Sequence, residues 1–158
     1  MKKNIQFNDK LSPNNISFIR IKDHNRIKRT LLEFNDGLPP LQGEEEYVDS
    51  VSEKIAANGI VYCLQEKTKR IGFFSIYAND HTTQTAFISF IAVGPQYRNE
   101  GYGSKLLNKA ILTAKENDMK TLKLEVLKYN TNAQRFYKKH GFTFSSESEN
   151  SIYLERAI

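Results

Sequence analysis

The sequence predicts a fold of the α/β (α+β) class, with a mixed central sheet of about six to seven strands flanked by about four helices. Short apolar runs between polar turns predict strands, and longer segments with apolar residues at every third or fourth position predict helices. A strand, a helix and a second strand follow one another over residues 86–127, which indicates a right-handed crossover between parallel strands. The remaining strands are separated by short turns, which favours antiparallel pairing and therefore a mixed sheet.

Four segments are expected in the first part of the chain. Asp23 is a suitable N-cap for the first helix, and Asn58-Gly59 is a suitable stop for the second, whose first turn is acidic. Glycine and proline residues between the two helices exclude a helix there. The segments are a strand over 15–22, a helix over 24–35, an ordered loop over 35–43 and a helix over 44–57. The apolar stripe expected on the first helix consists of Ile27, Leu31, Leu32 and Phe34.

Strands dominate the rest of the chain. Polar turns over 66–70 and 78–83 separate three strands, and Pro95 ends the third because proline has no N–H to donate. Gly141 is a suitable residue after the last helix. The expected strands cover 60–65, 71–77, 86–93, 121–127, 142–148 and 151–156, and the expected helices cover 103–117 and 132–140. The apolar faces expected here consist of Leu106, Leu107, Ala110, Ile111 and Ala114 on the helix and Leu122, Leu124 and Val126 on the strand.

Composition indicates a single domain over 1–158, since 39% of the 158 residues are hydrophobic and 26% are charged. The first residues lack the apolar region of a secretory signal, and no apolar run approaches the roughly 20 residues that span a bilayer. One cysteine, Cys63, excludes an internal disulfide framework and is compatible with a reducing cytoplasm. We therefore expect a cytoplasmic protein, and the short apolar runs indicate no membrane partner. The three scattered histidines give no metal-binding spacing, so no metal is expected. The net charge of +5 comes from dispersed lysines and arginines, which favours an anionic small ligand over nucleic acid.

The segment PQYRNEGYGSKLL, residues 95–107, places Gly101 and Gly103 between an apolar strand and a helix. A Walker phosphate loop is excluded because Gly103 is followed by Ser104-Lys105 instead of Lys-Ser/Thr. A dinucleotide-binding fingerprint is excluded because Leu106 stands where the third glycine is needed. From this pattern alone, the two glycines either shape a turn or bring backbone N–H groups close to an anion.

Two blocks of the sequence together resemble the GNAT superfamily of N-acetyltransferases, and the resemblance covers residues 60–145. The first block is IAVGPQYRNEGYGSKLL, which is similar to the family pattern Arg/Gln-x-x-Gly-x-Gly/Ala after a strand that ends in Val-x-Pro. The second is VLKYNTNAQRFYKKHGF, which is similar to the pattern Asn-x-x-Ala-x-x-x-Tyr-x-x-x-Gly-Phe. The residues that match the second pattern are Asn130, Ala133, Tyr137, Gly141 and Phe142.

The resemblance implies a GNAT fold with a splayed parallel strand pair, and acetyl-CoA as cosubstrate. The pantetheine arm would hydrogen-bond to the backbone of Ile91, Ala92 and Val93, in the manner of an added strand. The pyrophosphate would bind to backbone N–H groups at the start of the following helix, with a charge-assisted contact from the first residue of the motif. The residues implied in pyrophosphate binding are Arg98, Asn99, Glu100, Gly101, Tyr102, Gly103 and Ser104.

Three of these assignments have a simpler alternative. Asn130 would either hydrogen-bond to the cofactor arm or only cap the following helix. Ser104 would either donate to a phosphate or only lie in the first helical turn, and Arg98 would otherwise be a solvated loop residue. Ala133 is small enough to let the cofactor pass across the start of the helix.

The resemblance also implies that Tyr137 is the general acid that protonates the leaving thiolate; without the motif, it would be expected only to pack on the sheet. A thiol has a pKa near 8.5 and a tyrosine near 10, so the tyrosine still carries a proton at neutral pH. Many members of the family have a Glu on the strand that enters the cofactor loop, but residues 85–93 contain no carboxylate. Ser89 is therefore expected to hold a water that relays the proton of the amine. Asp80 and His81 are the alternatives, although both would otherwise be plain turn residues; an acceptor amine that is only weakly basic would need little help.

The function implied is transfer of the acetyl group of acetyl-CoA to a primary amine of a small molecule, by direct attack in a ternary complex. The alternatives are acetylation of a protein N-terminus or lysine, and a non-catalytic acyl-CoA-sensing module. The family places its acceptor site near residues 34–47 and 77–83, where Asp36 and the glutamates at 44–46 either attract a cationic amine or stabilise a helix start. GLPPL and YAND faintly resemble bacterial GNAT proteins of polysaccharide synthesis, which suggests an amino sugar or a nucleotide-linked amino sugar. A monomer or a homodimer is expected.

Overall fold

The computed structural model describes residues 15–37 and 45–158. Within these residues the expected order of strands and helices is confirmed. Most of the predicted loop over 35–43, and the predicted start of the second helix at Glu44, lie outside the described residues. The strands are β1 (Ile16–Ile21), β2 (Ile60–Glu66), β3 (Lys69–Asp80), β4 (Thr85–Val93), β5 (Thr121–Leu127), β6 (Thr143–Glu147) and β7 (Ser151–Ala157). The helices are α1 (His24–Glu33), α2 (Glu45–Asn58), α3 (Tyr102–Glu116) and α4 (Thr131–Lys139), with short 3-10 turns η1 (Asn35–Gly37) and η3 (Pro95–Tyr97).

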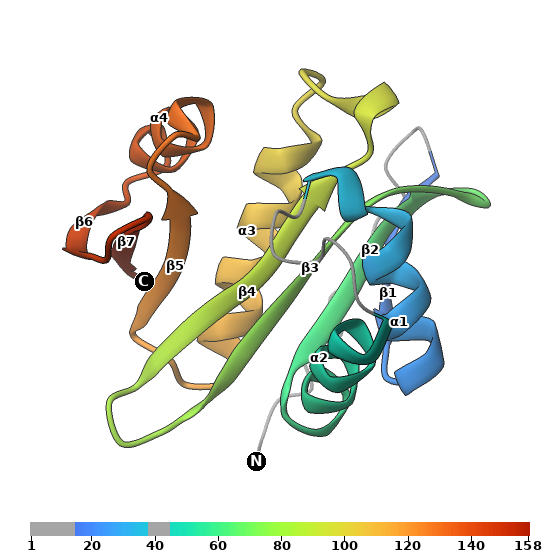
Figure 1. Cartoon of the computed structure of the whole chain (residues 1–158), viewed down its shortest axis with the longest axis horizontal. Coiled ribbons are helices and arrows are strands. Elements are labelled where there is room, and N and C mark those ends of the chain that lie inside the picture. Colours follow the sequence, from blue (N-terminus) through green and yellow to red (C-terminus); the bar gives the residue numbers. More distant parts are fainter. Residues whose placement is uncertain (1–14, 38–44) are drawn as a thin grey trace, which may run out of the picture.

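The seven strands form one mixed sheet in the order β1-β2-β3-β4-β5-β7-β6, as Figure 1 shows. Neighbouring strands are antiparallel except for β4 and β5, which are parallel and joined through α3. The predicted strand–helix–strand unit and the mixed sheet are therefore confirmed.

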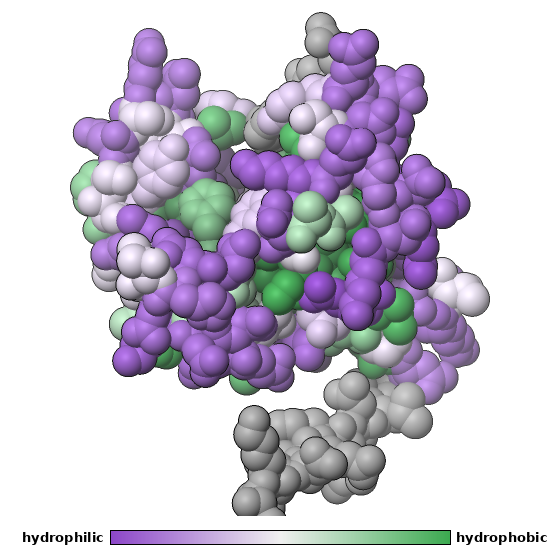
Figure 2. Space-filling view, turned by 90° about the horizontal axis from the view of Figure 1, so that it is seen from below, coloured by the Kyte–Doolittle hydropathy of each residue, from purple (hydrophilic) through white to green (hydrophobic). Residues whose placement is uncertain are grey.

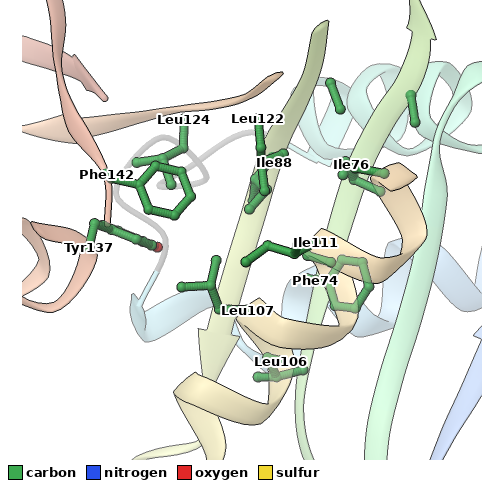
Figure 3. Packing of buried hydrophobic residues seen from close by; sticks show 14 of the residues in the cluster. Phe74, Ile76, Ile88, Leu106, Leu107, Ile111, Leu122, Leu124, Tyr137 and Phe142 are labelled. Atoms are coloured by element: carbon green, nitrogen blue, oxygen red, sulfur yellow. The ribbon is translucent and has the colours of Figure 1, made fainter. Parts of the chain in front are cut away.

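Two apolar clusters cover the two faces of the sheet. On one face, α1 and α2 pack over β2 and β3, with Leu31 and Ile55 fully buried. On the other face, α3 packs over β3, β4 and β5, and the same cluster continues to Tyr137 of α4 and to Phe142 (Figure 3). The expected apolar faces of α3 and β5 are all buried, which is why the helical and strand periodicities predicted these two elements well.

A β-bulge in β4 determines which side chains face which cluster. Ser75 pairs with Phe90 and Ile76 pairs with Ile88, so Ser89 is an extra residue without a direct partner on β3. Even-numbered side chains of β4 therefore change from one face of the sheet to the other at this point. Ala86 and Ile88 belong to the α3 cluster, whereas Phe90 and Ala92 belong to the α1/α2 cluster. The parallel ladder between β4 and β5 ends at the same place, with the pair of Ile88 and Leu124. Beyond it, the two strands separate and leave a gap (Figure 1).

Three local predictions are wrong. Leu32 is 48% exposed, because only Ile27, Leu31 and Phe34 of the predicted stripe face the sheet. The turn predicted over 66–70 is shorter, because the antiparallel ladder of β2 and β3 continues to Glu66 and Lys69.

The turn predicted over 78–83 begins later than expected. The third strand β3 extends through Asp80, and Ala78 is a buried core residue. The polar residues that follow Ala78 resemble a turn in sequence, but they continue the ladder up to the pair of Asp80 and Thr85.

The surface carries isolated apolar side chains. The large exposed ones are scattered over different elements: Leu32, Tyr47, Leu112, Tyr129 and Phe144. On the face seen in Figure 2, hydrophilic residues predominate and hydrophobic ones are confined to small patches. No helix among the described residues is long and apolar enough to cross a membrane.

Two leucines of α3 provide a test of this packing. Leu107 is fully buried against the sheet, and Leu112 on the same helix is 53% exposed. Leu107→Ala should lower the free energy of unfolding by about 2–5 kcal/mol, because it removes buried methyl groups and leaves a cavity. Leu112→Ala should change it by less than about 1 kcal/mol, since that side chain already contacts water. Urea unfolding measures both values, and equal losses for the two variants would contradict the assigned orientation of α3.

Candidate active site

Two adjoining cavities lie where β4 and β5 separate. The strand cavity, of about 230 Å³, lies between residues 87–91 of β4 and 124–127 of β5. The loop cavity, of about 700 Å³, lies between the segment after β4, residues 97–104, and the side of α4 that carries Ala133, Phe136 and Tyr137. Ile91, Ala133 and Tyr137 line both cavities, so these three residues mark the junction between them.

The glycine segment forms the start of α3 at the loop cavity. Gly101 is the N-cap, with φ +84°, and it offers no side chain to the N–H groups of the first helical turn. A Cβ at Gly101 would meet no atom within 4 Å, so the glycine is required by its backbone conformation and not by crowding. A Cβ at Gly103 would lie 3.5 Å from the Phe136 ring across the cavity. Uncapped N–H groups at the positive end of a helix, beside an open cavity, fit an anion such as a pyrophosphate.

Arg98 is less free than the sequence suggested. Its Nε donates to the backbone oxygen of Val93 at 3.1 Å, and its Nη2 lies 3.3 Å from the carboxylate of Asp36 in η1. Both predicted candidates, one for the phosphate and one for the amine, are therefore joined in an ion pair. The pair is half exposed, so a phosphate could compete for the guanidinium at little cost.

The neighbouring loop residues divide into two groups. Asn99, with φ 62°, lines the loop cavity together with Tyr102 and Ser104. Glu100 has an exposed side chain that lines neither cavity. Its predicted contact with the pyrophosphate is through the backbone N–H, which does not depend on where the side chain lies, and it stays a prediction.

The end of β4 presents backbone to the gap. Ile91, Ala92 and Val93 line the loop cavity, and on their other edge they pair with residues of β3. No ladder pair joins β4 and β5 beyond Ile88 and Leu124, so the edge of this segment that faces β5 can pair with an inserted chain. The side chains of Ile91 and Val93 pack on the α3 cluster, as expected of core residues.

Tyr137 is held in one orientation at the junction. It is 7% exposed, and its ring packs edge-on against Phe136 at 5.1 Å and Phe142 at 5.7 Å between ring centroids. In Figure 3 the ring projects from α4 toward the strands of the sheet. No hydrogen bond to its hydroxyl is found within the described part of the chain, so the proton is available to a ligand at the junction. Burial raises the pKa of this phenol far above its ordinary value, which keeps the proton on the oxygen.

Ser89 lines the strand cavity at the bulge. Its Oγ lies 2.5 Å from the Oγ of Ser75 and donates to the backbone oxygen of Ser75 at 3.3 Å. Ser75 is buried, so the two hydroxyls form a fixed polar pair on β3 and β4. A hydroxyl that is hydrogen-bonded in this way can orient a water molecule, but it has no carboxylate partner to pass a proton to.

Glu125 lines the strand cavity, and the sequence analysis did not single it out. It contributes the single charged side chain to the strand cavity, and it points away from the core because Leu124 and Val126 on either side are buried. It forms no ion pair among the described residues, whereas Lys123 on the same strand pairs with Glu155 at 3.8 Å. The signal was present in the alternation of LKLEVL, where a carboxylate stands between two core residues on the strand parallel to β4.

The remaining candidates have structural roles. Asn130 accepts from the backbone N–H of Ala133 at 3.1 Å and so caps α4, while both residues also line the strand cavity. Asp80 accepts from Thr83 twice, which lowers the pKa of its carboxyl and fixes the turn. Asp80 and His81 line neither cavity, so their alternative assignment as turn residues is supported.

The acceptor region is only partly described. Residues 38–44 of the segment predicted to bind the amine lie outside the described residues. Among the described residues, no group of three His, Cys, Asp or Glu side chains is arranged to hold a metal ion.

Two curated relatives share short, similar segments with this chain. Streptothricin acetyltransferase A of Bacillus subtilis is 49% identical over 57 residues, which are 36% of this chain and 33% of that protein. A second Bacillus subtilis protein, whose name proposes that it is a ribosomal protein bS18-alanine N-acetyltransferase, is 43% identical over 56 residues. That match covers 35% of this chain and 37% of the relative, so the similarity spans about a third of the length of each curated relative.

Solved structures and a family model extend the match to most of the chain. A GNAT family acetyltransferase from Elizabethkingia anophelis with acetyl-CoA bound is 22% identical, covers 93% of this chain and 100% of its own, and superposes with a TM-score of 0.69, which establishes the fold. The model of the acetyltransferase (GNAT) family matches residues 27–142, which include β4, the glycine segment, α3, β5 and α4. The chain belongs to the acetyltransferase (GNAT) family.

Proposed function

We propose that the protein transfers the acetyl group of acetyl-CoA to a primary amine of a small molecule, by direct attack within a ternary complex. The observation that carries the proposal is that Tyr137 lies at the junction of two cavities of different character. The N–H groups at the start of α3 have no side-chain cap and border the loop cavity, which suits a pyrophosphate. The strand cavity is lined by Glu125, which forms no ion pair among the described residues, and a carboxylate there suits an amine.

The cosubstrate fits the loop cavity and the gap together. Its pyrophosphate would bind the N–H groups around Gly101 and Gly103, and Arg98 would exchange Asp36 for a phosphate. Its pantetheine arm would pair with the free edge of β4, which would bring the thioester to the end of the ladder at Ile88, beside Tyr137. The relative with acetyl-CoA bound supports this choice of ligand.

Tyr137 would act as the general acid. The amine nitrogen attacks the carbonyl carbon of the thioester, the carbon–sulfur bond breaks, and the sulfur takes the proton of the tyrosine hydroxyl. The phenol can take this role because a tyrosine still carries its proton at neutral pH and can give it to the sulfur as the carbon–sulfur bond breaks. A bulk proton restores the phenol after the thiol leaves.

Glu125 would act as the general base, in the place of the carboxylate that β4 lacks. An alkylammonium has a pKa near 10.4, so it must lose a proton before it attacks. Glu125 lines the same cavity as Tyr137 and Ser89 but comes from the opposite strand. The amine would give its proton to this carboxylate, with the Ser75–Ser89 pair fixing a water between them where the amine is small.

The size of the strand cavity limits which amine can be the acceptor. A strand cavity of about 230 Å³ accepts an amine-bearing end of a substrate but not a whole sugar nucleotide, whose remainder would lie outside the cavity. The name of streptothricin acetyltransferase A favours a small molecule, whereas the name of the second relative favours the N-terminal alanine of a protein. Protein N-terminal acetylation is therefore the second candidate.

The experiment that tests the function is a thiol-release assay with acetyl-CoA and a panel of amines. The panel contains small primary amines, amino sugars, a nucleotide-linked amino sugar and a peptide with N-terminal alanine. Release with a small amine supports the proposal, and release with the peptide alone supports the second candidate. Thermal stabilisation by millimolar acetyl-CoA without turnover on any amine would favour a non-catalytic sensing module.

The protonation of Tyr137 gives a direct spectroscopic prediction. Because its pKa is raised by burial, the folded chain should keep this phenol protonated at about pH 11, where exposed tyrosines ionise. Folded wild type and Tyr137→Phe should therefore show the same rise in absorbance at 295 nm. In urea, wild type should show the signal of one additional tyrosine among the eight in the sequence. A difference already present in the folded proteins would contradict the burial of the phenol.

The free energy of unfolding should depend on pH through the ionisation of Tyr137. The unfolded chain releases the phenolic proton near pH 10 and the folded chain does not, so unfolding becomes more favourable as the pH rises above 10. Tyr137→Phe should lose less stability than wild type between pH 9 and pH 11 in urea unfolding.

Tyr137→Phe also tests the chemical role. Turnover should fall by on the order of 10²–10⁴, since the leaving thiolate loses its acid, while the affinity for acetyl-CoA in calorimetry is retained. Tyr129→Phe is the matched control, because Tyr129 is 75% exposed and lines neither cavity. Unchanged turnover in Tyr137→Phe would exclude it as the acid.

Glu125→Gln tests the base. Turnover at pH 7 should fall by on the order of 10²–10⁴ and recover partly as the pH is raised, because the amine then loses its proton to solvent. Glu149→Gln, at an exposed turn position, is the control and should follow the wild-type pH profile. A wild-type pH profile in Glu125→Gln would show that the proton leaves by another route.

A further inference from the structure

A histidine that the proposed chemistry does not use connects the two walls of the loop cavity. His140 caps the C-terminus of α4, and its Nε2 lies 3.0 Å from the Oγ of Ser104 in the first turn of α3. Its Nδ1 lies 2.7 Å from the backbone oxygen of Phe136, and its ring packs against the Phe136 ring at 4.4 Å between centroids, with the two planes tilted by 43°. Ser104 and Phe136 both line the loop cavity, so the imidazole contacts two residues of the cavity wall from the side away from the cavity.

The contacts of His140 determine the direction of both hydrogen bonds. A backbone oxygen can only accept, so Nδ1 carries the proton that is donated to Phe136. In the neutral ring Nε2 then has no proton, and it must accept from the hydroxyl of Ser104. While this bond exists, Ser104 cannot donate the same proton to a phosphate oxygen in the loop cavity.

We infer that His140 is a positioning residue for pyrophosphate binding, and that binding is coupled to the uptake of a proton by its imidazole. A protonated ring donates from Nε2 to Ser104, which turns the Ser104 hydroxyl over and directs its proton into the loop cavity. The anion would thereby gain one hydrogen-bond donor and one positive charge behind it. The inference rests on the proposed function only in taking a pyrophosphate as the ligand.

The charged side chains nearest to His140 in the sequence and at its backbone are cations. Arg156 of β7 donates to the backbone oxygen of His140 at 3.0 Å, and Lys138 and Lys139 precede it on α4. On α3, Lys105 follows Ser104. No carboxylate lies within ion-pair distance of the His140 ring among the residues that the structure describes. The charge of a bound pyrophosphate in the loop cavity would attract an added proton on the imidazole.

The test is calorimetric titration with dephospho-CoA in two buffers of different ionisation enthalpy. This ligand keeps the pyrophosphate but lacks the 3′-phosphate, whose second pKa near 6 would itself titrate. The wild-type chain should take up protons on binding between pH 6 and pH 8 and should bind about 2- to 10-fold more tightly at pH 6 than at pH 8. His140→Gln, which can still hydrogen-bond to Ser104, should bind without proton uptake and with little dependence on pH.

A second variant and a control separate the coupling from a general effect on folding. Ser104→Ala keeps the histidine but removes the connecting hydroxyl, so it should bind more weakly and with reduced proton uptake. His81→Gln, in the turn at the far end of β4, should keep the wild-type uptake. Equal proton uptake in wild type, His140→Gln and Ser104→Ala would overturn the inference while leaving the proposed function intact. Failure of the wild-type chain to bind dephospho-CoA and acetyl-CoA would contradict both.

Discussion

The pairing of β4 with β5, and its end at Ile88 and Leu124, is the constraint on which the candidate site depends. Up to this point the parallel ladder satisfies the backbone of both strands, and beyond it the edges that face each other have no partner in the sheet. The bulge at Ser89 places Phe90 and Ala92 in the α1/α2 cluster and Ile91 and Val93 against the α3 cluster, so the end of β4 is packed on both faces of the sheet. Packing of the core therefore keeps the ends of β4 and β5 apart. An extended ligand with amide groups could hydrogen-bond to the unpaired backbone edge of β4 in this gap.

The same residues serve both stability and the site. Tyr137 belongs to the core cluster and also lines both cavities, so the packing that buries its ring also fixes its hydroxyl and protects its proton. His140 joins α4 to the start of α3, so the wall that carries the proposed acid is tied to the wall that carries the proposed anion site. Arg98 and Asp36 make a similar connection between the loop and η1. The packing of Tyr137 and these two polar connections explain how a groove between separated strands keeps a defined shape.

Local periodicity predicted the elements well but could not reveal what the bulge and the long-range contacts do. The buried faces of α3 and β5 follow directly from their helical and strand periods, and Asp23 was recognised as an N-cap from its position. Glu125 could not be predicted from β4 alone, because β4 contains no carboxylate and Glu125 lies on β5. The two strands line one cavity although α3 separates them in the sequence. The ion pair of Arg98 with Asp36 could not be predicted, since nothing local connects residues so far apart.

The most direct measurement of the central claim is a map of coenzyme A binding by NMR on the ¹⁵N-labelled chain. The claim is that the ligand occupies the gap between β4 and β5 and the start of α3. The amides of Ile91–Val93 and Asn99–Ser104 should then show the largest changes in chemical shift, and amides of β1 and β2 should remain unchanged. Large changes confined to β1, β2 or β6, with the glycine segment unaffected, would contradict the account.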